Sequence, residues 1–297
     1  MQHLAGSTMM DAARIAFLFV LAVSLLPALA RAQEAQTNAG ATEPEIDTEH
    51  IFGFAEGSDI GSKGEREIES VTIGSFGKIG SYDNVDNETS FRYGVVDQLR
   101  LSVGTLTDYY NIYNVPGLSD RSSANFSGLI TELRWNIVDR HTSPFGMSLS
   151  INPEWRQFDP TSGERSENYS VPVTLLVDKE VVPNKFFAAL NLIYAPSFLH
   201  VNGGWEHDDS FMVIAAGTYA IAPNIFLGAE VRHENFAQNG YLDAHALFIG
   251  PSLFYRFSAN LTAKVAWAAQ IPDIGATTLD LGTYERHQVE LQFAYTF

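Results

Sequence analysis

The last nine residues of the chain, Val289 to Phe297, alternate apolar and polar side chains without a break and finish on an aromatic ring. Alternation with a period of two predicts a β-strand that has one apolar and one polar face. Because this strand runs to the final residue, we expect its edge to pair with another strand. The pattern is compatible with a closed barrel and with a β-sandwich.

The N-terminus carries the features of a secretory signal peptide. Arg14 precedes an apolar run from Ile15 to Leu26, and small residues occupy the two positions that a signal peptidase reads before residue 33. Pro27 ends the run, which is shorter than the about 20 residues of a transmembrane helix. We therefore expect residues 1–32 to be a cleaved signal peptide.

Composition narrows the class of protein. Asp11, Arg14 and Arg31 together carry a charge of +1, so removing residues 1–32 takes the net charge from −17 to −18. Such an acidic chain is not expected to bind nucleic acid. A mean hydropathy of −0.04 is too low for a bundle of transmembrane helices. The chain contains no cysteine, which excludes a lipoprotein anchor, disulfide bonds and thiolate chemistry.

The interior of the chain divides into alternating segments that resemble strands. Leu133 and Trp135, for example, alternate with Glu132 and Arg134. Counting back from the C-terminus gives about twelve strands, the first around residues 70–79. Short turns alternate with longer polar stretches at residues 81–88, 107–123, 158–167, 201–209, 237–243 and 272–284. We predict an all-β protein, a closed antiparallel transmembrane β-barrel with short periplasmic turns and longer extracellular loops; a soluble periplasmic or secreted all-β protein is the alternative.

Two resemblances support the barrel. The terminal strand resembles the C-terminal signature of bacterial outer-membrane β-barrels, which implies that Phe293, Tyr295 and Phe297 form an assembly signal read by the barrel-assembly machinery. It also implies contact with outer-membrane lipid and lipopolysaccharide. The runs Ile51 to Gly61 and Gly64 to Glu69 form an acidic, glycine-containing lead into the first strand. This lead is similar to that of outer-membrane barrels related to the family named for a phenol-degradation pathway (MetA-type), which implies a transport or channel role in a Gram-negative outer membrane.

The chain is therefore expected to have three parts. Residues 1–32 are the signal peptide, residues 33–63 an acidic N-terminal segment, and residues 64–297 the barrel. Residues 33–50 are polar and acidic with little to bury, which is typical of a loosely held segment. The sequence leaves open whether the acidic segment is periplasmic or lies in the lumen as a plug.

Few constellations suggest an enzyme. His141, Ser143 and Glu154 have a faint likeness to the catalytic residues of an outer-membrane lipid A deacylase, but the chain is far longer than that barrel. The run Trp205 to Asp209, with His200 nearby, contains groups that could bind a divalent cation, but contiguous side chains of an extended segment point apart. We therefore expect no catalytic residue, no metal ion and no cofactor.

The lumen is the better place to look for function. Arg or Lys facing lipid near the bilayer midplane costs about 2–4 kcal/mol, so charged strand residues are assigned to the lumen. The candidate lumen-lining residues are Arg92, Arg100, Glu132, Arg134, Arg156, Glu230, Arg232, Arg256, Lys264 and Glu290. With Glu154, Glu234 and Arg286 they make eight cations and five anions, a basic lining that favours anions.

These patterns indicate an outer-membrane channel or transporter for small polar solutes, with anions favoured. A structural or surface barrel with an occluded lumen is the second hypothesis, and an outer-membrane lipid-modifying enzyme the third. Barrels of about eight strands are filled by side chains, and those of about sixteen hold an aqueous channel. The sequence of a barrel of about twelve strands leaves the state of the lumen and the identity of the solute open.

Overall fold

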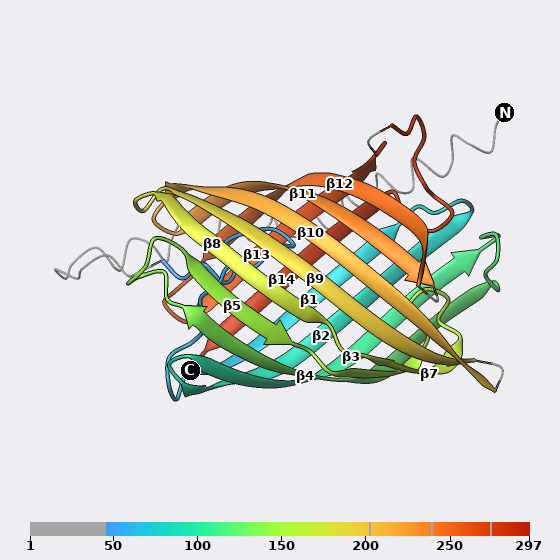
Figure 1. Ribbon diagram of the computed structural model, residues 1–297, viewed down its shortest axis with the longest axis horizontal. Helices are drawn as coiled ribbons and strands as arrows, with labels where there is room; N and C mark the ends of the chain where they lie inside the picture. The colour runs from blue at the N-terminus through green and yellow to red at the C-terminus, as the bar shows by residue number, and fades with distance from the viewer. Residues whose placement is uncertain (1–45, 202, 239, 274) are drawn as a thin grey trace. The chain divides into compact units, whose positions relative to one another are not determined.

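A computed structural model describes residues 46–201, 203–238, 240–273 and 275–297 (Figure 1). The expected signal peptide and residues 33–45 of the acidic segment lie outside the described residues. Within the described residues, no helix is long and apolar enough to cross a bilayer. Residues 47–297 form one compact unit.

The unit is a single antiparallel sheet that closes on itself. The first strand pairs with the last as well as with the second, and the ninth pairs with the tenth, so neither side of the sheet is left open. The described strands are β1 (Arg66–Phe76), β2 (Ser81–Val96), β3 (Leu99–Tyr113), β4 (Arg121–Val138), β5 (Gly146–Ile151), β6 (Glu154–Phe158), β7 (Arg165–Ser170), β8 (Val173–Val182), β9 (Phe186–Val201), β10 (Gly204–Ala222), β11 (Ile225–Gln238), β12 (Tyr241–Arg256), β13 (Leu261–Ile271) and β14 (His287–Thr296).

Two wall strands are each broken by a proline. β5 and β6 flank Asn152-Pro153 and both pair with β4, while β7 and β8 flank Val171-Pro172 and both pair with β9. Proline has no N–H to donate to the ladder, which is why the regular pairing stops there. The fourteen segments described are thus twelve wall strands, and the prediction of a closed antiparallel barrel of about twelve strands is confirmed.

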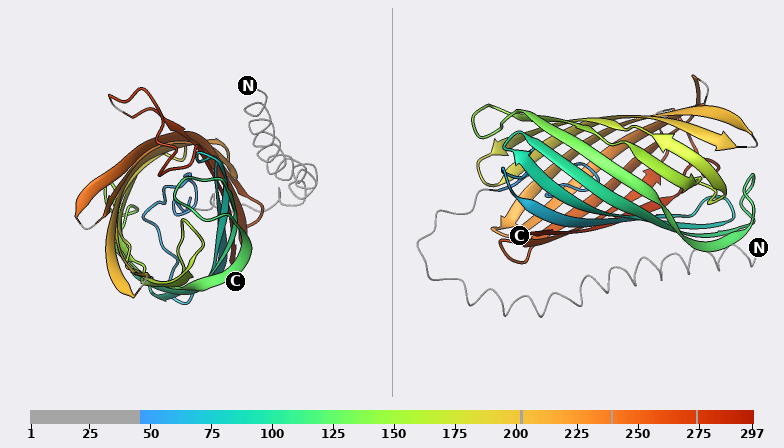
Figure 2. Two further views of the ribbon diagram at one scale, coloured as in Figure 1. Left: turned by 90° about the vertical axis from the view of Figure 1, so that its right-hand side faces the viewer. Right: turned by 90° about the horizontal axis from the view of Figure 1, so that it is seen from below.

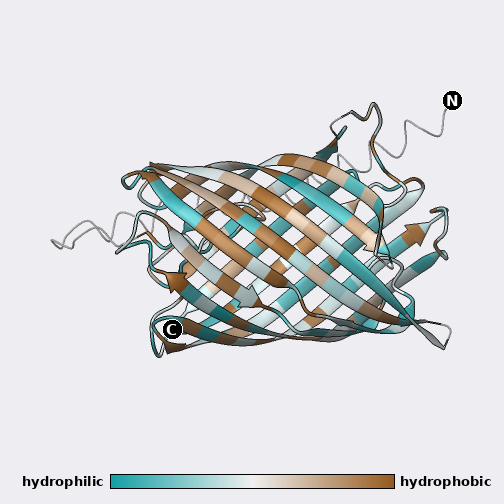
Figure 3. Ribbon diagram, in the orientation of Figure 1, coloured by the Kyte–Doolittle hydropathy of each residue, from teal (hydrophilic) through white to brown (hydrophobic). Residues whose placement is uncertain are grey.

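The strands expose their apolar face and bury their polar face, the reverse of a soluble protein. On β4, Leu133 and Trp135 are exposed whereas Glu132 and Arg134 are buried. Hydrophobic and hydrophilic residues alternate along the strands in Figure 3. Since the polar residues line the inside of the barrel, the outer face carries the apolar surface that a lipid environment requires.

The strands are longer than the sequence pattern indicated. Residues 81–88, which we expected to form a loop, belong to β2, and the first strand begins at Arg66 instead of near residue 70. β3 runs to Tyr113 and β10 starts at Gly204, so polar stretches there are also strand. Backbone pairing continues past the apolar belt, so polar composition alone does not end a strand.

We call the two ends of the barrel the turn end and the loop end. The turn end carries the C-terminus and the connections after β2, β4, β8, β10 and β12. The loop end carries the connections after β1, β3, β6, β9, β11 and β13, of which that between β13 and β14 is the longest. In barrels of this class, the short turns are periplasmic.

Residues 47–61 lie inside the barrel. Figure 2 shows this stretch in blue within the ring of strands. It forms neither helix nor strand, yet Ile51, Phe52 and Ala55 are at most 1% exposed. We call residues 47–61 the lumenal segment. Because it has no regular backbone pairing, it must be held by wall side chains.

Candidate functional site

Three arginines of neighbouring strands point into the lumen at one place. Arg92 lies on β2, Arg100 on β3 and Arg134 on β4, and all three are buried. The register of β3 and β4 sets Arg100 directly opposite Arg134. Like charges at facing positions destabilise a sheet. The arrangement therefore requires counter-charges.

Glu49 of the lumenal segment supplies one of them. Its carboxylate accepts hydrogen bonds from all three guanidinium groups, with nitrogen to oxygen distances of 3.0 Å from Arg92, 2.6 Å from Arg100 and 3.1 Å from Arg134. Glu132 of β4 supplies another and bonds Arg100 at 3.0 Å and Arg134 at 2.9 Å. Charge-assisted hydrogen bonds of this kind are among the strongest polar contacts in proteins.

The charge state of the lumenal segment follows from these contacts. Burial alone would raise the pKa of Glu49, but the positive charges of Arg100, His50 and the other two arginines hold its pKa well below its ordinary value. Burial alone would also raise the pKa of Glu56, but the positive charges of Arg134, which it contacts, and of Arg92 together lower it. Both carboxylates are therefore ionised at neutral pH.

His50 forms a second charged group of the lumenal segment. Its ring lies 3.7 Å from a carboxylate oxygen of Glu67 and 3.5 Å from one of Glu69, both on β1. Burial lowers the pKa of an imidazole, but the charge of Glu49 and the bonding and charge of Glu67 and Glu69 raise the pKa of His50 to about 9. His50, Glu67 and Glu69 have the spacing of a metal site. A protonated imidazole is a cation and not a ligand, so this group is an ion-pair cluster.

The middle of the lumenal segment is bonded to strands β11 and β13, on the side of the barrel opposite β2–β4. Lys264 of β13 donates to the carbonyl of Gly53 at 2.7 Å, and the amide of Ala55 donates to Glu230 of β11 at 3.2 Å. The guanidinium of Arg232 lies 4.2 Å from the centre of the Phe54 ring, a cation–π geometry. The segment thus spans the lumen from β2–β4 to β11–β13.

The end of the lumenal segment is bonded to the remaining wall. The amide and carbonyl of Glu56 bond the side-chain amide of Asn191 of β9 at 2.8 and 2.9 Å. The Ser58 carbonyl accepts from Asn136 at 3.0 Å and from Ser148. Asp59 accepts from Arg140 at 2.7 Å, close to the turn end. Backbone groups that lack secondary structure are thereby satisfied by buried side chains.

Two glycines let the lumenal segment pack this closely. A Cβ on Gly57 would lie 2.3 Å from the carbonyl oxygen of Thr48, and a Cβ on Gly53 would lie 2.4 Å from a carboxylate oxygen of Glu230. Both distances are shorter than non-bonded atoms allow. The glycines noted in the sequence therefore serve close approach within the lumen.

Towards the loop end, the lumenal segment forms the floor of a cavity of about 340 Å³. Arg156 on its wall is paired with Glu154 and lies 2.6 Å from Asp86. Seven carboxylates and five cationic side chains line the cavity. Carboxylates thus outnumber cations in this part of the lumen, whereas the sequence count gave a basic lining. The carboxylates are Glu56, Glu69, Asp86, Glu88, Glu132, Glu154 and Glu290, and the cations are Arg92, Arg134, Arg156, Arg232 and Lys264.

Connections at the loop end also fold inward. Buried Tyr82 and Tyr110 donate to the carbonyls of Thr161 and Asp159, in the connection between β6 and β7, at 3.0 and 3.2 Å. On the other side, Tyr284 packs on Phe248 of β12 with ring centres 6.3 Å apart, in a cluster that Phe54 also contacts. Parts of the connections between β6 and β7 and between β13 and β14 thus pack against inward-facing side chains of the wall.

Most of the lumen-lining residues expected from the sequence are buried inside the barrel. Arg92, Arg100, Glu132, Arg134, Glu230, Arg232, Lys264 and Glu290 are buried, and Arg156 and Arg256 are half-buried. Those in direct contact with the lumenal segment are Arg92, Arg100, Arg134, Glu230, Arg232 and Lys264. Glu132 and Glu290 pair with Arg134 and Lys264 of that set. Phe293, Tyr295 and Phe297 are exposed on the outer face of β14 and just beyond it.

Sequence reasoning missed several lumenal groups. Glu67 and Glu69 precede the expected start of the first strand, although their alternation with Ile68 was a usable signal. Asn191 shares its strand face with the apolar Phe187 and Ile193, which leaves the direction of its side chain ambiguous in the sequence. Glu49 and Glu56 lie in a segment without periodicity, which carries no signal for position.

Two groups of residues were set aside in the sequence analysis, one as a catalytic site and one as a metal site, and the structure places their members as follows. His141 lies 3.7 Å from Asp59 at the turn end, whereas Glu154 is paired with Arg156 in the cavity wall. Residues 205–209 belong to β10, where successive side chains alternate between faces. His200 stacks on Trp205 across the β9–β10 pair, 4.9 Å between ring centres.

The model of a family of unknown function (DUF6662) matches residues 44–297, which include the lumenal segment and the whole barrel. The chain belongs to this family. No curated protein matches the sequence significantly. The family match begins just before the lumenal segment, so the segment and the barrel are parts of one family unit.

One solved structure in particular shares the fold of this family member. An outer membrane channel from Pseudomonas putida F1 aligns with a TM-score of 0.56 at 12% identity, over 81% of this chain and 98% of that one. The KdgM porin in complex with disordered oligogalacturonate (TM-score 0.46, 12% identity, 78% and 99% coverage) and the NanC porin (0.46, 9%, 77% and 98%) align less closely. The first of these alignments shows that the DUF6662 chain has the β-barrel fold of an outer membrane channel.

Proposed function

We propose that this protein is an outer-membrane channel for small polar solutes that its own lumenal segment holds closed. The proposal rests chiefly on the contact of Glu49 with Arg92, Arg100 and Arg134, which fixes a peptide across a charged lumen. The fold supports a channel, and the polar, charged wall supports polar solutes.

Opening requires the lumenal segment to leave or rearrange. The segment is held by ion pairs and hydrogen bonds rather than by strand pairing, so its release leaves the barrel ladder intact. Released wall arginines and carboxylates can be rehydrated, which lowers the cost of opening relative to breaking the sheet. The barrel wall is then the same in the closed and the open state, and the two states differ in the position of the lumenal segment.

The proposal also concerns the charge of the solute, that is, whether the channel prefers anions or cations. The sequence count favoured anions, but it omitted Glu67, Glu69, Asp86 and Glu88, which lie on the inner side of β1 and β2. When Glu56 leaves with the lumenal segment, six of the seven carboxylates remain around the cavity with five cations, so we propose a channel for polar solutes with weak charge preference.

Planar-bilayer conductance tests this proposal. We expect the mature chain to conduct little and a variant lacking residues 33–61 to conduct well. A variant lacking only residues 33–46 keeps Glu49 and its contacts with Arg92, Arg100 and Arg134, and it serves as the matched control, with conductance like that of the full mature chain. Heat-dependent migration in SDS checks that each variant is folded.

Two outcomes contradict the proposal in different ways. A folded but non-conducting variant lacking residues 33–61 would establish the second hypothesis, a structural barrel with an occluded lumen. Equal conductance of all three proteins would retain a channel but remove the closing role of the lumenal segment.

A further inference from the structure

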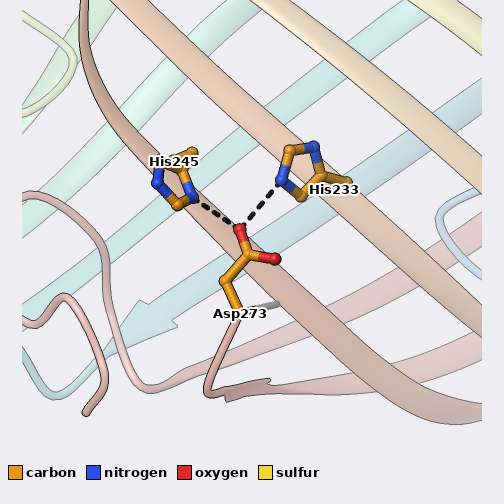
Figure 4. A group of neighbouring side chains, drawn as sticks. All are labelled: His233, His245 and Asp273. Carbon is orange, nitrogen blue, oxygen red and sulfur yellow. Dashed lines mark hydrogen bonds and ion pairs between the residues drawn. The ribbon is translucent and has the colours of Figure 1, made fainter. Parts of the chain in front are cut away.

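Three side chains with metal-binding groups meet on the outer side of the barrel near the loop end (Figure 4). His233 comes from β11, His245 from β12 and Asp273 from the connection after β13. In the register of β11 and β12, Asn235 faces His245, so His233 and His245 are diagonal neighbours on one face. Their neighbours Arg232 and Ala246 are buried on the inner face, so both histidines project outward.

The two rings converge on one carboxylate oxygen. Nε2 of His233 lies 2.9 Å and Nδ1 of His245 lies 2.5 Å from Oδ2 of Asp273. All three candidate ligand atoms lie within 4.8 Å of one another. The Asp273 side chain is 10% exposed, whereas the rings are 37% and 46% exposed. The carboxylate is thus shielded beneath two imidazoles that remain open to an approaching ion.

The three candidate ligand groups favour one class of metal ion. Two imidazoles and one carboxylate suit Zn²⁺ and neighbouring transition metals, while Ca²⁺ and Mg²⁺ prefer sets made only of oxygen. Three protein ligands leave a position for water. The side-chain amide of Asn235 lies 3.1 Å from Nδ1 of His233 and orients that ring, as outer-shell partners of metal ligands do.

We propose that His233, His245 and Asp273 bind one divalent transition-metal ion of the Zn²⁺ class. In the metal-bound form each imidazole is neutral: it offers the lone pair of the nitrogen that now faces Asp273 at roughly 2.0–2.1 Å from the ion and carries its one proton on the other ring nitrogen. The ligand atoms must move apart to admit the ion, because two ligands of a tetrahedral Zn²⁺ lie about 3.3 Å from each other, against 2.9 and 2.5 Å in this structure. The half-exposed rings of His233 and His245 have room to move away from the shielded carboxylate of Asp273.

A bound ion ties β11 and β12 to the connection that leads to β14. The same connection carries Tyr284, which packs inside the barrel on Phe248. The ion therefore cross-links the outer wall to a loop that also bounds the lumen. We expect metal binding to raise the temperature at which the folded barrel unfolds, because the ion binds only the folded arrangement.

Zn²⁺ titration of the folded, detergent-purified mature chain tests the site. The protein is made without a polyhistidine tag, and isothermal calorimetry gives affinity and stoichiometry. We expect one Zn²⁺ per chain and a loss of affinity of at least about tenfold in His233→Ala, His245→Ala and Asp273→Asn, since even outer-shell changes cost about 10–100-fold. Mg²⁺ should give no comparable binding.

The matched control removes two other exposed imidazoles near acidic groups. His200 and His207 lie 3.9 Å from Glu167 and 3.5 Å from Asp209, and we expect the His200→Ala, His207→Ala variant to bind like wild type. Asp273→Asn keeps the shape of the carboxylate and covers the case in which a histidine variant fails to fold. Zn²⁺ should raise the unfolding temperature of wild type and of the control, but not of Asp273→Asn.

Three results would overturn the site. The first is wild-type protein that does not bind Zn²⁺. The second is unchanged affinity and stoichiometry in the His233→Ala, His245→Ala double variant. The third is loss of binding in the His200→Ala, His207→Ala control instead. None of these measurements depends on conductance, so the metal site and the proposed channel are tested separately.

Discussion

Glu49 and Arg100 are 51 residues apart in the sequence, yet the carboxylate and guanidinium lie 2.6 Å apart inside the barrel. Glu49 is also shared with Arg92 and Arg134, and Arg100 faces Arg134 across the β3–β4 pair. The lumenal segment thus neutralises charge that the wall itself brings together. This relationship makes the closed state testable by single substitutions.

Glu49→Gln should weaken closure most. Removing one partner of a buried ion pair costs about 3–5 kcal/mol, because it leaves the other charges uncompensated. We expect more frequent channel openings in planar bilayers. Glu65→Gln is the control, since the carboxylate of Glu65 accepts hydrogen bonds from the exposed Ser62. Equal opening frequencies in the two variants would show that Glu49 does not hold the segment.

Gly57→Ala should loosen the lumenal segment by overpacking. The added Cβ would lie 2.3 Å from a backbone oxygen of Thr48, and overpacking costs about 1–3 kcal/mol. The chain has no cysteine, so a single Ala55→Cys reports exposure by thiol labelling. We expect faster labelling in the Gly57→Ala background. Gly282→Ala, whose Cβ would meet its nearest neighbour at 3.5 Å, should leave the rate unchanged; an unchanged rate with Gly57→Ala as well would contradict the packing argument.

Closure should weaken at alkaline pH through His50. Its pKa is about 9 in the docked segment against 6.5 ordinarily, so protonation favours docking. The stabilisation is complete below pH 6.5 and is lost as the pH rises through about 9. We expect openings to increase across this window, and the increase to be smaller in His50→Gln. A conductance that stays flat across the same window would exclude this role.

The opened pore should discriminate weakly between cations and anions. Carboxylates and cations are nearly balanced on the cavity wall. In the variant lacking residues 33–61, we expect a reversal potential near zero in a KCl gradient. Neutralising Arg92 and Arg134 should shift it towards cation selectivity, whereas exposed Arg66→Gln should not. Strong anion selectivity would restore the expectation drawn from the sequence.

The terminal strand should be needed for assembly. Phe293, Tyr295 and Phe297 are exposed on the outer face, and the amide of Phe297 donates to the carbonyl of Arg66 at 2.9 Å. We expect deletion of Phe297, or serine at all three positions, to abolish the heat-modifiable folded band in outer-membrane fractions. The control places serine at the exposed Phe211, Tyr219 and Ile221 of β10. Normal levels of both terminal variants would remove the assembly role.

The barrel and the direction of most wall side chains could be predicted from the amino-acid pattern. Period two is a local property, so Glu132 and Arg134 could be assigned inward and Leu133 outward without a structure. The same rule could have found Glu67 and Glu69. The prediction was wrong for residues 81–88, which were judged by their polar composition and not by alternation. The polar end of a strand has the same composition as a loop.

Which groups meet inside and outside the wall depends on the closed fold. Alternation fixes the face of a residue but not its partner, and the partner depends on strand register, as with Arg100 and Arg134. His233, His245 and Asp273 converge by register and by the path of one connection. Glu49 lies in a segment with no periodicity. Glu49 lies where three buried arginines need a negative charge, and these arginines come together only when the barrel closes.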